Sequence, residues 1–212
     1  MTSLRRSLIV ALAVVAAVVA AVFFLRRGTQ PGNEEATSDL LLSRFFVSDS
    51  LGMSLRLPES KRWVLRRGRG GTEPVVSATC EGEAATVRVF ASPITADLGD
   101  LEAVLRRRQA EMAGKLGVKN LDDVIEAVLR NEKQVIDGSP ALQWQASSVP
   151  IESAGEKAQR IVFMWQMVKR PARVFECIGL VRVPSKASDQ EMAEADILLQ
   201  DVVFILQSFQ VR

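Results

Sequence analysis

The stretch that decides the fold is RIVFMWQMV, residues 160–168. Both sets of alternating positions in it are apolar: Ile161, Phe163, Trp165 and Met167 on one side, and Val162, Met164 and Val168 on the other. Successive side chains of a β-strand point to opposite faces of the sheet, so a strand that is apolar on both sides must be covered on both faces. The stretch therefore predicts a central strand with another layer packed on each face of its sheet.

The segments around this strand predict a mostly antiparallel sheet. Residues 169–173, KRPAR, form a turn, and residues 174–183 return as VFECIGLVRV. The pair Asp137-Gly138 is a strong turn signal between the apolar segments on either side of it. Further strands are expected at residues 45–47, 53–57, 63–65, 75–80, 85–91, 124–129 and 141–145. Short connections of this kind join neighbouring antiparallel strands.

One helix is expected in the middle of the chain. Residues 101–116 place their leucines and Met112 on one side, between an N-terminal cap at Asp100 and a C-terminal cap at Gly117. The charged residues of this segment are expected to face solvent: Arg106, Arg107, Arg108 and Glu111.

A second helix is expected at the end of the chain. It opens with Ser188-Asp-Gln-Glu191, a capping box in which two side chains satisfy backbone N–H groups. Its apolar side runs through Met192, Ala195, Leu198, Leu199, Val202, Ile205, Leu206 and Phe209. The sequence therefore predicts an α+β fold, an α-β-α sandwich around a mostly antiparallel sheet, preceded by one N-terminal transmembrane helix.

The transmembrane prediction rests on residues 8–25, LIVALAVVAAVVAAVFFL, which include no charged, polar, Gly or Pro residue. At about 1.5 Å per residue, a helix of this length spans roughly 27 Å, close to the hydrocarbon core of a bilayer. A signal peptide is the alternative, but the run ends in FFLRR, residues 23–27, without a small-residue cleavage site. We therefore expect an uncleaved membrane anchor.

The anchor divides the chain into four parts. They are a tail at residues 1–7, the transmembrane helix at 8–25, a flexible tether at 26–40 and the α+β domain at 41–212. Arg5 and Arg6 on one side of the run balance Arg26 and Arg27 on the other, so the positive-inside rule is nearly tied. The free amino terminus favours a domain on the outer side, periplasmic or extracellular.

The composition argues against several classes of function. The chain has no His, which excludes Ser-His-Asp and Cys-His catalysis and HExxH zinc sites. It also lacks a G-x-S-x-G motif, a Ser three residues before a Lys, and a P-loop. Apart from the four arginines that flank the anchor, the chain has 23 basic and 25 acidic residues. This balance of charge disfavours nucleic acid as a partner. We expect no catalytic residues, no cofactor and no metal site.

The two cysteines are candidate site residues. Cys80 and Cys177 lie in predicted strands without a CxxC pattern, and two cysteines without histidine make a poor zinc site. On the outer side of a membrane they could form a disulfide if their Cα atoms lie within about 7 Å of each other. On the inner side they are expected to be buried free thiols.

A basic segment, RRGRGG, is the other candidate site. Arg66, Arg67 and Arg69 in this expected loop could bind phosphates or anionic headgroups, because arginine is charged and glycine leaves the backbone accessible. A solvated loop is the alternative interpretation. The tryptophans could line a ligand pocket, although large aromatic residues in strands usually belong to the core: Trp63, Trp144 and Trp165.

Three short motifs carry a resemblance to a known family. They are DSLGMSLRLP at residues 49–58 followed by Trp63, IDGSPA at 136–141, and ILQSF at 205–209. From about residue 44 to 212 the chain resembles the PsbP-like fold, whose bacterial relatives include the DcrB-like envelope proteins. The resemblance implies an α-β-α sandwich and a binding or assembly role without catalysis. It transfers no functional residues to this chain.

Together these features predict a single-pass, membrane-anchored, non-enzymatic envelope protein whose domain binds or assists another protein. The expected partners are membrane lipid around residues 8–25 and an unidentified protein. A small-ligand, lipid or metal-ion-binding envelope protein is the alternative function, and an enzyme is the third.

Overall fold

The computed structural model describes residues 39–60, 62–94, 100–152 and 158–212. The predicted membrane span at residues 8–25 and the predicted tether up to residue 38 lie outside the described residues. Among the helices that are described, none is both long enough and apolar enough to cross a membrane.

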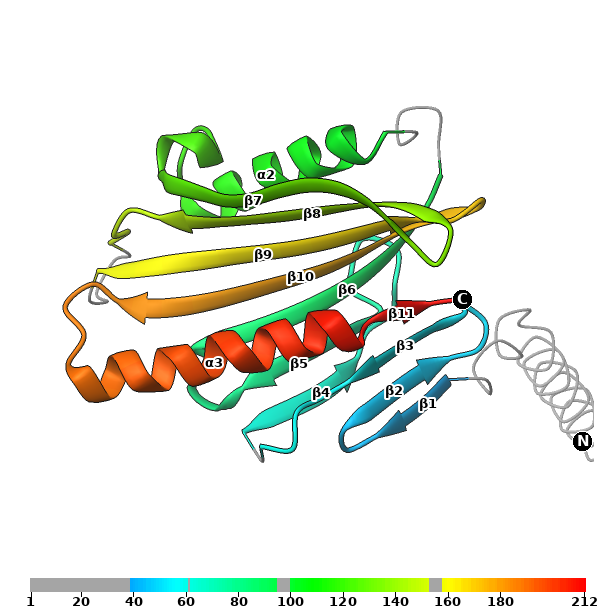
Figure 1. The fold of residues 1–212 in the computed structure, drawn as a ribbon, viewed down its shortest axis with the longest axis horizontal. Helices are drawn as coiled ribbons and strands as arrows, with labels where there is room; N and C mark the ends of the chain where they lie inside the picture. The colour runs from blue at the N-terminus through cyan, green and yellow to red at the C-terminus, as the bar shows by residue number, and fades with distance from the viewer. Residues whose placement is uncertain (1–38, 61, 95–99, 153–157) are drawn as a thin grey trace, which may run out of the picture. The chain divides into compact units, whose positions relative to one another are not determined.

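A seven-stranded sheet forms the centre of the domain (Figure 1). Its strands follow the order β4 (Trp63–Arg67), β5 (Val76–Cys80), β6 (Ala85–Pro93), β10 (Arg173–Pro184), β9 (Gln159–Lys169), β8 (Ser139–Ser148) and β7 (Ile125–Ile136). All neighbouring pairs are antiparallel. The β7–β8 turn has Asp137 and Gly138 at φ angles of 48° and 74°, which confirms the predicted Asp-Gly turn.

The sequence predicts one sheet, and the described residues form two. The second sheet has the order β1 (Asp39–Leu42), β2 (Phe45–Ser48), β3 (Met53–Arg56) and β11 (Gln210–Val211). The β2–β3 hairpin is the predicted one, but β3 pairs with the C-terminal strand, with Val211 opposite Met53. This pairing joins distant parts of the chain, so no local sequence pattern indicates it.

The α-helices among the described residues confirm the predicted boundaries. They are α2 (Leu101–Leu116) and α3 (Asp189–Ser208), and two short 3-10 helices, η2 (Glu81–Glu83) and η4 (Leu121–Asp123), are also described. Asp100 caps α2 by accepting a hydrogen bond from the backbone N–H of Glu102, and Gly117 ends it at a φ of 71°. Ser188 and Glu191 form the capping box of α3.

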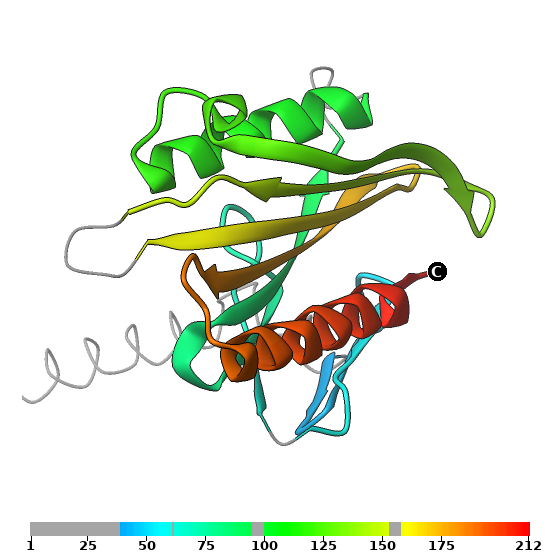
Figure 2. The same ribbon diagram turned by 60° about the vertical axis from the view of Figure 1, so that its left-hand side comes forward.

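The helices pack on opposite faces of the large sheet (Figure 2). On one face, α2 shares a core with Ile161, Phe163, Trp165 and Met167 of β9. On the other face, α3 and the small sheet share a core with the alternate positions Met164 and Val168. The prediction of a central strand covered on both faces is therefore confirmed, and the domain has an α+β fold.

A glycine on β10 brings α3 close to the sheet. A Cβ atom at Gly179 would lie 2.4 Å from Cγ1 of Val202 and 3.2 Å from Cδ1 of Leu206. No side chain larger than hydrogen fits at this distance, so the helix can seat directly on the central strand.

Each helix covers only part of its face. The helix α2 packs over β8, whereas α3 packs over β10 and β6. On the α3 side, Gln143 and Gln145 of β8 are half-buried, and on the α2 side Arg66 of β4 and Arg88 of β6 are exposed, so each face is partly open. These two open areas differ in chemistry.

Candidate functional site

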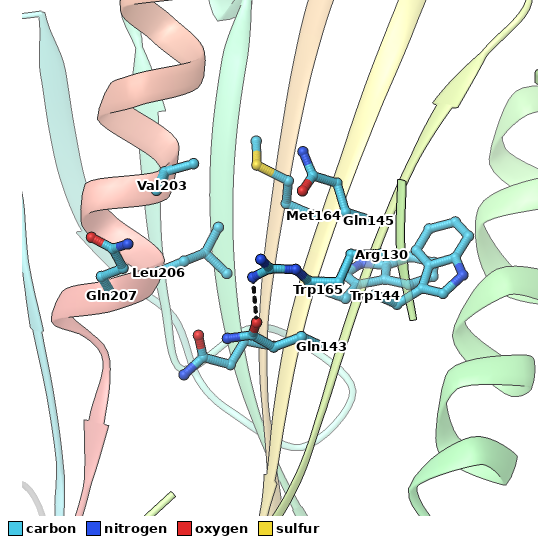
Figure 3. Close-up of a pocket in the computed structure, with 10 residues that line it drawn as sticks. Arg130, Gln143, Trp144, Gln145, Met164, Trp165, Val203, Leu206 and Gln207 are labelled. Carbon is cyan, nitrogen blue, oxygen red and sulfur yellow. Dashed lines mark hydrogen bonds between the residues drawn. The ribbon is translucent and has the colours of Figure 1, made fainter. Parts of the chain in front are cut away.

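The first open area forms a groove between α3 and the strands β7, β8 and β9 (Figure 3). Its volume is about 90 Å³. The groove is lined by Arg130, Gln143, Trp144, Gln145, Met164, Trp165, Gln166, Val203, Leu206 and Gln207. Four of these residues are glutamines, and we call this site the amide groove.

The strand register brings the glutamines of the sheet together. Gln143 on β8 lies opposite Gln166 on β9, and Gln145 lies opposite Met164. Directly opposed residues project from the same face of a sheet. The side chains that therefore all belong to the α3 side are those of Gln143, Gln166, Gln145 and Met164. Gln166 is 7% exposed, while Gln143 and Gln145 are half-buried. The floor of the groove therefore carries neutral donors and acceptors.

The helix contributes the apolar wall of the groove. Val203 and Leu206 project from α3 toward the sheet (Figure 3). Leu206 is buried, but Val203 is 39% exposed although it is apolar. The groove thus combines amide groups with an apolar side chain that is partly in contact with solvent.

Arg130 is the one ionisable residue among those that line the amide groove, and its charge is compensated. Its Nη1 donates a hydrogen bond to Oε1 of Gln143 at 2.8 Å, and its Nε lies 3.7 Å from Oε2 of Glu132. None of the lining residues is a nucleophile with an adjacent base. This arrangement suits non-covalent binding of a neutral, partly apolar partner.

A buried ion pair on the opposite face corrects one prediction. Arg108, expected to face solvent, is only 9% exposed, and Glu176 of β10 is 0% exposed. Nε and Nη2 of Arg108 donate to the two carboxylate oxygens of Glu176 at 2.8 and 3.0 Å. Nη1 donates to Glu111 at 2.6 Å, and the guanidinium carbon lies 4.3 Å from the ring centre of Phe90.

Both charged groups of this ion pair have hydrogen-bond partners, and the pair connects α2 to the strand β10. Burial lowers the pKa of Arg108, but the hydrogen bonds and charges of Glu176 and then Glu111 raise it, and the net pKa is raised. Sequence reasoning missed the pair although one signal was present. Glu176 is the single acid in the apolar stretch 174–181, and an acid in a buried strand requires a cationic partner.

The two cysteines do not meet. Both are buried free thiols. Cys177 lies opposite Val89 on β6, and Val89 lies opposite Val76 on β5, four residues away from Cys80. Two strand spacings and four residues separate them, far beyond the roughly 7 Å between Cα atoms that a disulfide allows. The register therefore rules out the disulfide in this fold, and burial raises the pKa of both thiols.

The three arginines of the basic segment do not form one site. Arg66 and Arg67 belong to strand β4 and not to a loop, and they therefore project to opposite faces of the sheet. Arg69 follows in the connection to β5, and all three side chains are exposed. The predicted RRGRGG anion loop is thus divided, with Arg66 on the α2 side of the sheet and Arg67 on the other side.

The tryptophan side chains belong chiefly to the core. Trp144 and Trp165 stack with their ring centres 4.8 Å apart in the α2-side core. Trp63 lies in the α3-side core, and its Nε1 donates to Asp201 of α3 at 2.8 Å. Among the described residues, no three Cys, Asp or Glu side chains are arranged to hold a metal ion.

Comparison with known proteins identifies no family. No protein-family model matches the chain, and no curated protein matches it. Similar solved structures include a protein of Bacteroides thetaiotaomicron, with 13% identity, a TM-score of 0.39 and coverage of 81% of this chain and 49% of that one. This chain therefore spans about half the length of that protein.

Two further solved structures are similar over most of their own length. LpqN of Mycobacterium tuberculosis, described as involved in cell envelope biogenesis, has 15% identity, a TM-score of 0.44 and coverage of 77% of this chain and 86% of that one. The Ran-binding protein Mog1p of Saccharomyces cerevisiae has 11% identity, a TM-score of 0.40 and coverage of 81% and 96%. At these values the similarities assign neither a family nor a function, and the resemblance to the PsbP-like fold stays a prediction.

Proposed function

We propose that this protein is a membrane-anchored, non-enzymatic binding protein, and that its domain binds a protein partner in the amide groove. The observation that carries the proposal is the combination, in one groove, of four glutamine side chains with the half-exposed apolar residue Val203. Protein interfaces combine apolar contacts with direct hydrogen bonds and disfavour uncompensated charge at their centre.

The chemistry of the groove indicates the kind of partner segment. Glutamine amides donate and accept hydrogen bonds, so they can pair with the peptide groups of a bound chain. Arg130 is already engaged by Gln143 and Glu132, so the groove does not select for a strongly acidic segment. We expect an uncharged polypeptide segment with an apolar side chain that packs against Val203 and Leu206.

Site-specific cross-linking in native membranes tests this function. A photo-reactive amino acid replaces Val203 in the full-length chain, and the matched control replaces Glu194, an exposed residue of α3 outside the groove. We expect a covalent adduct with one protein partner from position 203 and none from position 194. Absence of an adduct at 203, or the same adducts at both positions, would contradict the proposal.

A second variant links the adduct to the groove. Gln145→Ala with the photo-reactive residue kept at position 203 removes one amide from the groove without touching the ion pair of the other face. We expect a weaker adduct, because a hydrogen bond to the partner is lost. An unchanged yield would argue that the partner lies against α3 but outside the groove.

The membrane part of the proposal rests on residues 8–25 and places the domain on the outer side. A C-terminal tag on the full-length chain reports this orientation through its access to protease in intact spheroplasts. We expect digestion of the tag without lysis. Protection of the tag until the membrane is opened would place the domain inside.

A further inference from the structure

The second open area of the large sheet carries a row of cationic and hydroxyl side chains. The register places Arg66 on β4 opposite Ser77 on β5, and Ser77 opposite Arg88 on β6. Residues opposed in this way share a face, and Arg88 lines the same cleft as Phe90 and Arg108 of the α2-side core. Arg66 and Arg88 therefore stand on the α2 side of the sheet, two strand spacings apart, which is roughly 9.5 Å.

Of this row, Arg88 lines a cleft between α2 and the strands β6 and β10. We call it the basic cleft, and its volume is about 60 Å³. Arg88, Lys115, Thr72 and Thr86 are among the residues that line it. One water requires roughly 10–15 Å³ on this measure, so the cleft admits a group of a few heavy atoms and no folded partner.

The charges at the cleft do not balance. Among the described residues, the side chains of Arg66, Arg88 and Lys115 form no ion pair and no hydrogen bond. Glu111 is the one acid among the described residues that line the cleft, and it is engaged by Arg108 at 2.6 Å and by Arg107 at 3.8 Å. Two of the cations that line the cleft, Arg88 and Lys115, are thus left without compensation.

One residue that lines the cleft carries an unpaired hydrogen-bond donor. Trp165 lines the cleft and is 2% exposed, and its Nε1 is buried without an acceptor among the described residues. A buried hydrogen-bond donor without an acceptor costs about 1–3 kcal/mol of folding free energy, so native structures contain few such donors.

We propose that the basic cleft is a binding site for a small ligand with a phosphate group. A phosphate has three or more acceptor oxygens and a double negative charge near neutral pH, which matches the charges of Arg88 and Lys115 together with the hydroxyls of Thr72 and Thr86. A single carboxylate would compensate only one of the two charges. This site lies on the opposite face from the amide groove, and the proposal does not depend on the function proposed for that groove.

Titration calorimetry with inorganic phosphate, at low ionic strength and with the full-length chain in a neutral detergent, tests the site. We expect binding at one site per chain. Arg88→Gln and Lys115→Gln each raise the Kd by at least about tenfold, which corresponds to one charge-assisted hydrogen bond. The matched control Arg106→Gln removes the same charge from an exposed position of α2 outside the cleft and leaves the Kd within about twofold.

Several outcomes would overturn the proposal. They are absence of phosphate binding to the unmodified chain, a Kd that rises equally in the Arg106→Gln control, and displacement of phosphate by acetate at equal ionic strength. Urea unfolding of each variant identifies a loss of binding that is caused by unfolding. Competition by glycerol 3-phosphate and by a short-chain phosphatidic acid then assigns the source of the phosphate. A site for lipids prefers the phosphatidic acid, whereas a site for soluble ligands binds both compounds equally.

Discussion

At the scale of single residues, the most consequential feature is the carboxylate of Glu176, which is fully buried in a central strand and held by two hydrogen bonds from Arg108. Removing one partner from a buried ion pair leaves an uncompensated charge, which costs about 3–5 kcal/mol. We therefore expect Glu176→Gln to lower the free energy of unfolding by about 3 kcal/mol, measured by urea unfolding of the full-length chain with tryptophan fluorescence.

The control for this prediction removes both partners. The double variant Arg108→Met with Glu176→Leu should recover most of the lost stability, because apolar residues of similar volume often replace a buried pair without cost. A loss below about 0.5 kcal/mol in Glu176→Gln would show that Glu111 compensates Arg108 sufficiently on its own.

The thiols give a second prediction at this scale. Burial raises the pKa of Cys80 and Cys177, and the thiolate is the reactive form, so both should resist iodoacetamide at pH 8 in the native chain. Both should react after unfolding in urea. Intact mass spectrometry without reductant checks this, and a chain lighter by two hydrogens, with no thiol to alkylate after unfolding, would contradict the sheet register.

At the scale of elements, the contact between α3 and β10 depends on the absence of a side chain at Gly179. In Gly179→Ala the new methyl group would lie 2.4 Å from Val202, so the helix has to move away from the sheet. We expect a loss of about 1–3 kcal/mol in the free energy of unfolding, the usual cost of overpacking a core.

Gly114→Ala is the matched control for the same change on the other helix. A Cβ at Gly114 meets no atom within 4 Å, and the residue is exposed in the last turn of α2. Alanine should therefore stabilise the domain by about 0.5–1 kcal/mol, because it restricts the unfolded chain and favours helix. If Gly179→Ala also stabilised the domain, α3 would not be seated on β10 as described.

At the scale of the whole molecule, the C-terminal residues join the two sheets. Phe209 and Val211 are 3% and 4% exposed within the α3-side core, and the backbone N–H of Arg212 donates to the carbonyl of Gly52 at 2.7 Å. Arg170, beyond the end of β9, also donates to the carbonyl of Val211. The end of the chain thus closes the small sheet and connects it to the large one.

Deletion of residues 209–212 should therefore destabilise the whole domain. Loss of two buried side chains and the β3–β11 pairing predicts a decrease of at least about 3 kcal/mol, together with faster hydrogen exchange in β2 and β3. Gln210→Ala, at an exposed position of the same strand, should change stability by less than about 0.5 kcal/mol. Equal stability of the truncated and intact chains would show that the small sheet holds together without β11.

Local patterns determined the elements of this fold. The two-sided apolar pattern of residues 160–168 predicts a covered central strand, and the caps at Asp100, Gly117 and Ser188 locate the helix ends. These signals are reliable because they arise from neighbouring residues, through the alternation of a strand or the unpaired N–H groups of a helix end. The composition by itself argues against imidazole chemistry, because the chain contains no histidine.

Only the tertiary structure decided which residues meet. The register separates Cys80 from Cys177 and places Arg66 in one row with Arg88. Packing of α2 buries Arg108 against Glu176, and incomplete coverage by each helix leaves the amide groove and the basic cleft open. These residues are far apart in the chain, and their proximity depends on strand order and helix placement. A sequence pattern reports only on near neighbours, so it does not reveal these contacts.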